Sequence, residues 1–193
     1  MTSERGGRAI AGPGVRAFEL VEHNCFACGS LNEHGLQLVL HVEPGRSWTE
    51  LTLEERFEGW AGIAHGGILA TILDEVMAWA LVGDDTWGLT ARMSIDFRRP
   101  ARVGQLIRAE GRVLRTRRRL VETTGRIADA RTGEELASAT ATYMAADPVR
   151  RQALQERYGF RFAGSGPPSD LGVGGLDTTP RREERTIVRS SAP

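Results

Sequence analysis

The feature that most constrains this chain is an apolar stretch of eighteen residues at 65–82, HGGILATILDEVMAWALV. Its length and its few polar breaks favour a helix over a strand, and the apolar positions surround the helix axis almost completely. We therefore expect a helix that is buried on most of its sides. Such a helix needs other elements of the same domain to cover it.

Segments on both sides of this helix alternate between apolar and polar residues, as half-buried strands do. Before it, 36–43 alternates up to the Pro44-Gly45 turn and 47–57 is its expected hairpin partner; after it come 89–97, 107–113, 121–129 and 136–144. One buried helix among antiparallel strands predicts an α+β fold, an antiparallel sheet wrapped around one long central helix. A single sheet layer leaves an open side and free edges, which favours dimerisation.

Composition changes at both ends of the 193-residue chain. Residues 1–16 and 164–193 hold nine of the 23 Gly, and the second of these segments holds four of the eight Pro. We expect a disordered N-terminal segment at 1–16, a domain at 17–147, a short helix at 148–160 and a disordered tail at 161–193.

The charge excludes several classes of protein. All 25 basic residues are Arg and are balanced by 25 Asp and Glu, so a general polyanion binder is not expected, nor is lysine Schiff-base or P-loop chemistry.

No apolar run reaches the roughly 20 residues that span a bilayer. The start of the chain lacks an apolar signal core, and two Cys do not make a disulfide scaffold. We expect a cytoplasmic protein with no membrane or nucleic-acid partner.

The start of the predicted helix carries two glycines, Gly66 and Gly67. The first backbone N–H groups of a helix have no partner within the helix, and residues without Cβ let a ligand approach them closely. With the helix dipole, they suit an oxyanion that forms in a transition state. The alternative is a tight turn that packs the helix against a strand. His65 precedes them as a general base, a helix cap or a packing residue.

Asp74 lies in the middle of the same helix, among the small residues Ala70, Thr71 and Ala78. A carboxylate is costly there, so it indicates either a catalytic group or a polar residue at a helix interface. Asp74 lies roughly 12 Å along the axis from Gly66, at about 1.5 Å per residue. One helix therefore cannot easily bring both groups to one carbonyl, whereas two antiparallel copies can, which predicts an obligate homodimer. The adjacent Glu75 is interpreted as a satisfied or solvated charge.

Cys25 and Cys28 form a CxxC without a second pair. A compact turn is the simplest interpretation; a metal site that uses His23 or His34 and a redox pair are the alternatives.

Charge is uneven along the chain. Residues 87–119 hold ten Arg against two acids, a net +8, whereas 19–58 hold eight Glu against two Arg, a net −6. A solvated strand face and a site for a small phosphorylated ligand both fit this pattern.

The helix segment HGGILATILDEVMAWA resembles the central-helix motif of hotdog-fold acyl-CoA thioesterases, in the group that includes the phenylacetate-pathway enzymes. That motif is His-Gly-Gly followed by an acid nine positions after the His, the spacing of His65 and Asp74. The upstream NCFACGSLNEHGLQL and the later IDFRRPARVG resemble the family too, and the likeness covers roughly 24–146.

The resemblance implies catalytic roles for a few residues. The Gly66 N–H, with Gly67 as a second donor, polarises the thioester carbonyl, and Asp74 of the opposite subunit is the general base or nucleophile. A hydroxyl on the following strand assists, which is Thr90 here, although strict alternation puts Thr90 on the face of Arg92 and Ser94. Gly59 departs from the family, which often has Asn or Gln there.

The sequence therefore predicts a homodimer or homotetramer that hydrolyses acyl-CoA, without a metal or other cofactor. Trp60 is expected to shape the acyl pocket, and the CoA phosphates are expected to bind at Arg98, Arg99, Arg115 and Arg117. One alternative is a hydratase of 2-enoyl thioesters, which needs His65 to face the substrate. The other is a non-catalytic acyl-CoA or lipid-binding dimer, which the absence of an amide at Gly59 favours.

Overall fold

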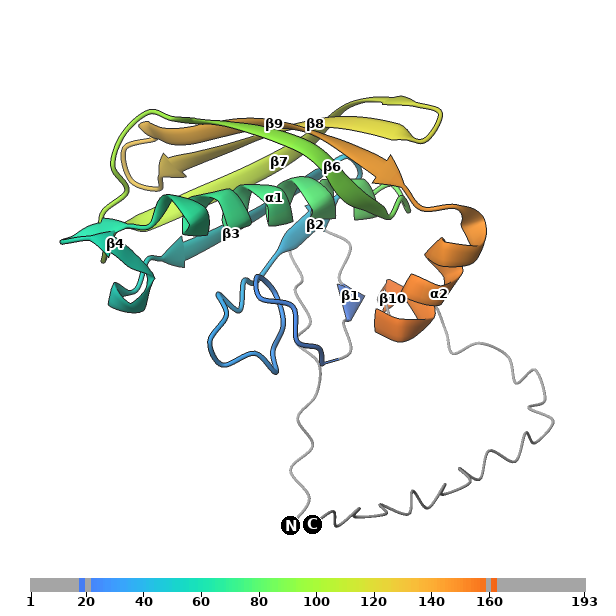
Figure 1. Cartoon of the computed structure of the whole chain (residues 1–193), viewed down its shortest axis with the longest axis horizontal. Coiled ribbons are helices and arrows are strands. Elements are labelled where there is room, and N and C mark those ends of the chain that lie inside the picture. The colour runs from blue at the N-terminus through green and yellow to red at the C-terminus, as the bar shows by residue number, and fades with distance from the viewer. Residues whose placement is uncertain (1–17, 20–21, 159–160, 163–193) are drawn as a thin grey trace, which may run out of the picture.

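A computed structural model describes residues 18–19, 22–158 and 161–162 of the chain. The expected disorder at 1–16 and most of the 161–193 tail lie outside these residues. A long helix, α1 (Gly66–Val82), lies along one face of a six-stranded antiparallel sheet (Figure 1). The strand order is β2-β3-β7-β8-β9-β6, with β2 at His41–Glu43, β3 at Arg46–Thr52, β6 at Gly88–Phe97, β7 at Leu106–Arg117, β8 at Leu120–Asp129 and β9 at Glu135–Ala145. The predicted α+β fold, a sheet around one central helix, is confirmed.

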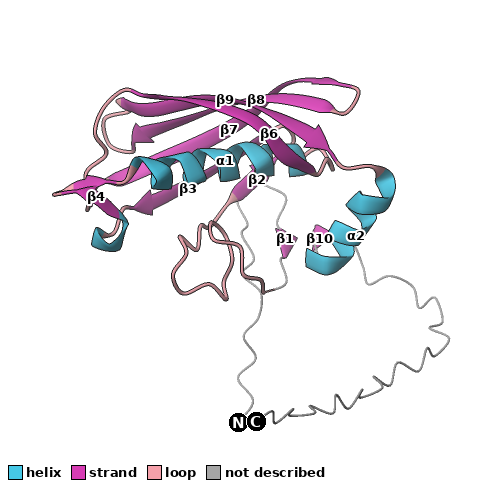
Figure 2. Cartoon of the chain, viewed as in Figure 1, coloured by secondary structure: helices cyan, strands magenta, loops and turns pink. Residues whose placement is uncertain are grey.

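Smaller elements surround this core (Figure 2). One turn of 3₁₀ helix precedes a short hairpin, and a second helix follows the last strand of the main sheet. Their bounds are Glu55–Phe57 for the 3₁₀ turn, Glu58–Trp60 for β4, Ile63–Ala64 for β5, Pro148–Tyr158 for α2, and Phe18–Glu19 and Arg161–Phe162 for the paired strands β1 and β10. No helix among the described residues is both long and apolar enough to cross a membrane.

The helix is buried where it contacts the sheet, as its apolar composition predicts. Ile72, Leu73, Val76 and Met77 have no solvent exposure. The approach of helix to sheet is close at Gly111 of β7, because a Cβ there would collide with the Val76 carbonyl. Glycine at that position therefore lets the backbones of α1 and β7 pack directly together.

The first predicted strand, 36–43, is largely wrong. Only His41–Glu43 pairs as a strand, and its partner β3 ends at Thr52 rather than at 57. The buried leucines before it are held by the preceding loop, since the Leu36 N–H donates to the Phe26 carbonyl and the Leu38 N–H to the Ala27 carbonyl, each at 2.8 Å. Their alternation therefore reflects packing of a loop, in which Gln37 has a φ of 48°.

Candidate active site

Asp74 lies half-buried in the middle of α1, facing the last two strands of the sheet. Its Oδ1 accepts a hydrogen bond from Thr90 Oγ1 at 2.7 Å and another from the Tyr143 hydroxyl at 2.8 Å. The same Tyr143 hydroxyl lies 3.0 Å from the Asp74 main-chain oxygen. No hydrogen bond reaches Oδ2 from the described part of the chain. One oxygen of the carboxylate is thus fixed by two hydroxyl groups, and the other is free to act on a substrate or water.

Thr90 reaches Asp74 because β6 contains a β-bulge. Thr90 pairs with Tyr143 of β9, but the next pair is Arg92 with Thr142, so Ala91 is an extra residue between them. A bulge of this kind redirects the side chains on one side of it. The placement of Thr90 on the face of Arg92 and Ser94, which assumed strict alternation, is therefore wrong, and Thr90 lies on the helix side.

Tyr143 was not singled out from the sequence. It is fully buried on the inner face of β9, in line with Ala137, Ala139 and Ala141. Burial and the negative charge of Asp74 raise the pKa of the Tyr143 phenol, so it stays protonated and donates a hydrogen bond. The signal in the sequence is a single phenol among small residues, since a buried Tyr hydroxyl needs a polar partner.

The start of α1 is capped by His65. Its Nδ1 accepts a hydrogen bond from the Gly67 N–H at 2.9 Å, so that N–H is already used. The Gly66 N–H, in contrast, donates no hydrogen bond to any described residue. At the first turn of a helix, this N–H combines an unpaired donor with the positive end of the dipole. Of the two predicted oxyanion donors, Gly66 is the available one.

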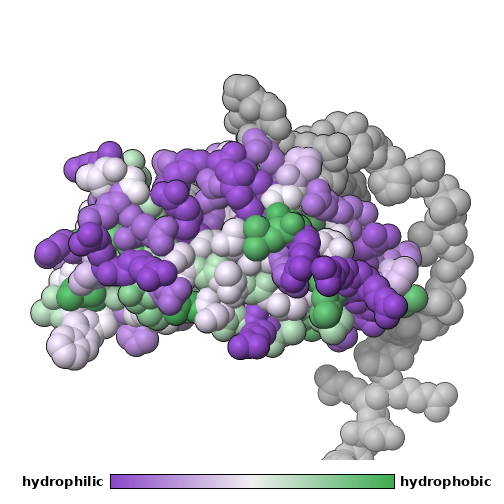
Figure 3. All heavy atoms as spheres, turned by 90° about the horizontal axis from the view of Figure 1, so that it is seen from above, coloured by the Kyte–Doolittle hydropathy of each residue, from purple (hydrophilic) through white to green (hydrophobic). Residues whose placement is uncertain are grey.

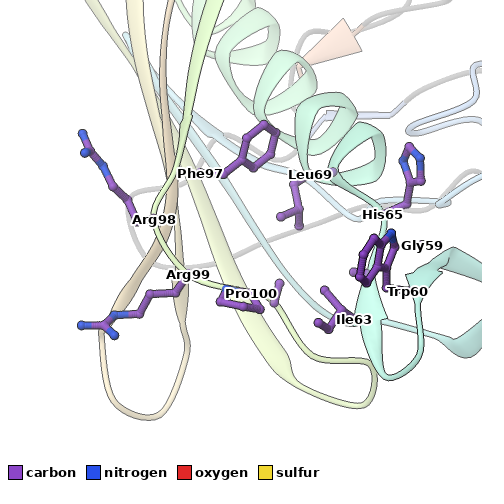
Figure 4. A pocket seen from close by; sticks show the side chains of 12 residues that line it. Gly59, Trp60, Ile63, His65, Leu69, Phe97, Arg98, Arg99 and Pro100 are labelled. Atoms are coloured by element: carbon purple, nitrogen blue, oxygen red, sulfur yellow. The ribbon is translucent and has the colours of Figure 1, made fainter.

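Gly66 lines an open pocket of about 530 Å³, and Figure 4 shows other side chains of its wall. Its walls are mostly apolar and include Ile63, Leu69 and Phe97. A Cβ on Gly66 would lie 3.4 Å from the Phe97 ring, so the ring covers one side of the helix start. Trp60 stands at the rim with 83% of its surface exposed. Trp60, which was predicted to shape the acyl pocket, is thus one of the residues that line this pocket.

Four arginines were predicted to bind phosphate, and the structure brings two of them to the pocket. Arg98 and Arg99 follow β6 and belong to the pocket wall, although Figure 4 shows their guanidinium groups extending away from Leu69 and Phe97. Both are exposed, and the closest acidic partner of Arg99 is Glu134 at 2.7 Å.

The other two arginines lie elsewhere. Arg115 forms a two-contact ion pair with Glu122 at 2.6 and 2.7 Å. The strand registers put Arg115 and Arg117 at the end of the sheet opposite to Arg98. They are therefore not part of this pocket within one chain.

Ion pairs between strands join the basic segment 87–119 to the acidic segment 19–58. Arg46 of β3 pairs with Glu110 of β7 at 2.8 Å, and Arg108 of β7 pairs with Glu50 of β3 at 2.7 Å. Only the second pair matches an Arg of the basic segment with a Glu of the acidic one. Figure 3, which looks onto the side of the sheet away from α1, is dominated by hydrophilic residues. A solvated strand face therefore fits part of the local excess of Arg.

Gly59 stands where the family resemblance leads one to expect an amide side chain. A Cβ at Gly59 would lie 2.9 Å from the Cα of His65 and 3.1 Å from its Cδ2. The hairpin strand β4 is therefore packed against the capping His, and there is no room for a side chain. In this chain no amide from that position reaches a water or a carbonyl.

Within one chain, the Gly66 pocket and the Asp74 cluster are separate, because α1 holds them roughly 12 Å apart along its axis. The strand β6, which carries Thr90, is the last strand of the sheet, so one of its edges is unpaired among the described residues. That strand also exposes 65% of Leu89 and 56% of Phe97. An exposed edge with apolar side chains is a surface on which a second chain can pair.

Comparisons with known proteins agree with this fold. Residues 61–135 match the family model described as thioesterase superfamily. Acyl-coenzyme A thioesterase 13 from Homo sapiens is 29% identical over 101 residues, which are 51% of this chain and 72% of the relative. A crystal structure of a thioesterase superfamily protein aligns with a TM-score of 0.59 and 25% identity, over 63% of this chain and 60% of that one.

A third relative is a hypothetical thioesterase protein from Streptococcus pneumoniae, whose structure was solved with coenzyme A. It is 19% identical, with a TM-score of 0.52, over 54% of this chain and 83% of that one. Structures of two variants have also been solved. In one an Asp is replaced by Ala, in the other a Thr is replaced by Ala, and the two positions are 16 residues apart. Family model and fold together confirm the predicted resemblance of this chain to the hotdog-fold thioesterase superfamily.

Proposed function

We propose that the protein hydrolyses acyl-CoA thioesters to a free acid and CoA, at two equivalent sites of a homodimer. The observation that carries this proposal is the Asp74 carboxylate, whose Oδ1 is held by Thr90 and Tyr143 while Oδ2 stays free. The match of residues 61–135 to the thioesterase superfamily supports the reaction class. Asp74 and Thr90 are 16 positions apart, the separation of the Asp and Thr replaced in the streptococcal relative.

In this mechanism the thioester carbonyl oxygen accepts a hydrogen bond from the Gly66 N–H. Asp74 removes a proton from a water molecule, whose oxygen attacks the carbonyl carbon. The resulting oxyanion is stabilised by the Gly66 N–H and the helix dipole. The C–S bond then breaks, the carboxylic acid forms, and the CoA thiolate leaves and takes up a proton. Asp74 as a direct nucleophile is the alternative first step, with water hydrolysing the acyl-enzyme anhydride afterwards.

The dimer is needed because the two groups lie far apart on one helix. If two chains associate about a two-fold axis through their β6 edges, the helix start of one chain lies opposite the middle of the other helix. Gly66 of one subunit and Asp74 of its partner then serve one substrate. The exposed Leu89 and Phe97 of β6 would be covered in this arrangement.

Substrate binding follows from the pocket at the helix start. Apolar walls at Leu69 and Phe97, with Trp60 at the rim, suit an acyl or pantetheine chain. Arg98 and Arg99 lie at the surface, where their guanidinium groups can exchange an acidic partner for the CoA phosphates. The coenzyme A in the streptococcal structure supports this class of ligand.

The test is a panel of acyl-CoA substrates with short, long and aromatic acyl groups, assayed for release of free thiol. Hydrolysis of at least one of them is expected. Loss of enoyl absorbance without thiol release would instead indicate a hydratase, and calorimetric binding without turnover would indicate a non-catalytic acyl-CoA-binding dimer.

Thr90→Val and Tyr143→Phe are each expected to lower kcat by about 10- to 100-fold. Each variant removes one hydrogen bond to Asp74, and a hydrogen bond to a charged group contributes about 1.5–3 kcal/mol. Steady-state thiol release gives the measurement. Thr142→Val is the matched control, because Thr142 lies on the opposite face of β9 from Tyr143. An equal loss in Thr142→Val would contradict the assignment.

Substitutions at His65 separate capping from catalysis. His65→Ala is expected to lower the free energy of unfolding by about 1 kcal/mol because the Gly67 N–H loses its acceptor. His65→Asn keeps a good cap, so it should retain both stability and thiol release. Urea unfolding and kinetics check the two effects. A large loss of activity in the stable His65→Asn variant would show that the imidazole itself takes part in the reaction.

A further inference from the structure

The loop before β2 presses two cysteines against the middle of α1. Cys25 and Cys28 are half-buried in a tight turn, in which the Gly29 N–H donates to the Cys25 carbonyl at 2.9 Å. A Cβ at Gly29 would collide with the Cys25 backbone, so the turn requires glycine. The turn is therefore built to hold the two sulfur atoms in a fixed relation.

A third side chain reaches these sulfurs from the helix. The Cys25 Sγ, the Cys28 Sγ and a carboxylate oxygen of Glu75 all lie within 4.8 Å of one another. Glu75 is half-buried, and its Oε1 accepts a hydrogen bond from Trp79 Nε1 at 2.8 Å. Of the two interpretations of Glu75, a satisfied or a solvated charge, the hydrogen bond from Trp79 fits the first, and the carboxylate also lies close to two thiols.

His23 lies beside this group of three. Its Nε2 lies 3.4 Å from the Cys28 Sγ, and its ring packs edge-on against Tyr158 of α2 at a centroid distance of 5.4 Å. In a tetrahedral zinc site with bonds of about 2.3 Å to sulfur and about 2.0 Å to nitrogen, neighbouring ligand atoms are about 3.5 Å apart. The separation of His23 and Cys28 matches one edge of such a tetrahedron, but no His23 nitrogen lies within 4.8 Å of all three ligand atoms, so the imidazole would have to move to complete the site.

We propose that Cys25, Cys28 and Glu75 form a Zn²⁺ site, which the neighbouring His23 completes by moving from its contact with Cys28. Two sulfurs, one imidazole nitrogen and one carboxylate oxygen are ligands that zinc accepts, whereas Mg²⁺ and Ca²⁺ take oxygen ligands. With His23 as the fourth protein ligand no position stays open, so the role is structural. The ion would join the N-terminal loop to α1 at the residue next to Asp74, and thereby stabilise the helix segment that carries the catalytic carboxylate.

The sequence led us to expect no metal, with a site that uses His23 or His34 only as an alternative, and it gave no role to Glu75 in such a site. A CxxC alone lacks half of a zinc-binding set, and Glu75 is far from it along the chain. Only the fold brings the carboxylate of α1 to the loop. The proposal does not depend on acyl-CoA hydrolysis, since its readouts are the metal and its spectrum.

The test is metal analysis of the tag-free full-length protein, after dialysis against zinc and removal of loosely bound ion. About one zinc per chain is expected in the wild type, and a large loss in Cys28→Ser and Glu75→Gln. His34→Ala and Glu33→Gln, two exposed positions of the same loop, are matched controls that should keep the zinc. A strong chelator should lower the Tm of the wild type by several degrees, and zinc should restore it.

A second measurement does not depend on whether the variants fold. The wild type loaded with Co²⁺ in place of zinc should show the visible absorption of a tetrahedral ion and a sulfur-to-cobalt charge-transfer band. Absence of stoichiometric zinc in the reduced wild type, or a cobalt spectrum without sulfur ligation, would overturn the proposal. A mass lower by two hydrogens in freshly purified protein, with no metal taken up after reduction, would show that the pair is a disulfide instead.

Discussion

Asp74→Asn is expected to lower kcat for acyl-CoA hydrolysis by about 10²- to 10⁴-fold, the range that a general base contributes. The amide is nearly isosteric with the carboxylate, and its oxygen still accepts the hydrogen bonds of Thr90 and Tyr143. It has no basic oxygen, however, so it cannot take a proton from water or attack the carbonyl carbon. The loss therefore falls on the chemical step, and thiol release under saturating substrate measures it.

The control for this variant is Asp84→Asn. Asp84 is exposed just after the end of α1, and its carboxylate forms no hydrogen bond with any described residue. Its activity should stay near that of the wild type. Thermal unfolding followed by circular dichroism confirms that Asp74→Asn is folded. A folded Asp74→Asn enzyme with more than about a tenth of wild-type kcat would exclude Asp74 as the base or nucleophile.

Much of the fold could be predicted because hydrophobic periodicity is a local property. The helix at 65–82 and the strand at 89–97 agree with α1 (Gly66–Val82) and β6 (Gly88–Phe97) to within a residue. The prediction of a strand at 36–40 failed because buried leucines alternate there with more exposed residues, while the N–H groups of Leu36 and Leu38 donate to carbonyls of a loop rather than of a strand. Alternation thus indicates which side chains are buried, but it does not indicate where the backbone N–H and C=O groups of the segment form their hydrogen bonds.

The candidate site was predictable only in part, for a related reason. Gly66 and Asp74 follow from their positions on one helix, because helical spacing is regular. The orientation of Thr90 depends on the bulge at Ala91, and strict alternation places it on the wrong face. Tyr143 and Glu75 acquire their contacts only when segments far apart in the sequence meet, which no local pattern reports.

Gly66 can be tested without disturbing the helix. Gly66→Pro removes the N–H, and proline is favoured at the first position of a helix. The preceding His65 has a φ of −62° and a ψ of 133°, the extended conformation that a residue before proline prefers. Loss of one oxyanion donor is expected to lower kcat by about 10²- to 10³-fold. Gly66→Ala keeps the N–H, with its Cβ in ordinary contact with Phe97, and should lose far less.

The two inactive variants together test whether each site is shared between subunits. A heterodimer of an Asp74→Asn chain and a Gly66→Pro chain, purified through two different affinity tags, is expected to recover about half of the wild-type activity per dimer. In the shared arrangement, one site combines the intact Gly66 of the first chain with the intact Asp74 of the second. The other site combines both defects and stays inactive.

Separate sites within each chain lead to the opposite result. Every site of the heterodimer would then contain one defect, so its activity would not exceed that of either parent variant. A heterodimer of differently tagged Asp74→Asn chains is the matched control and should remain inactive in both cases. If the two tags cannot be co-purified, the chains do not form stable dimers. That result would contradict the proposal of a shared site, because α1 holds Gly66 and Asp74 of one chain roughly 12 Å apart along its axis and a single chain cannot bring them together.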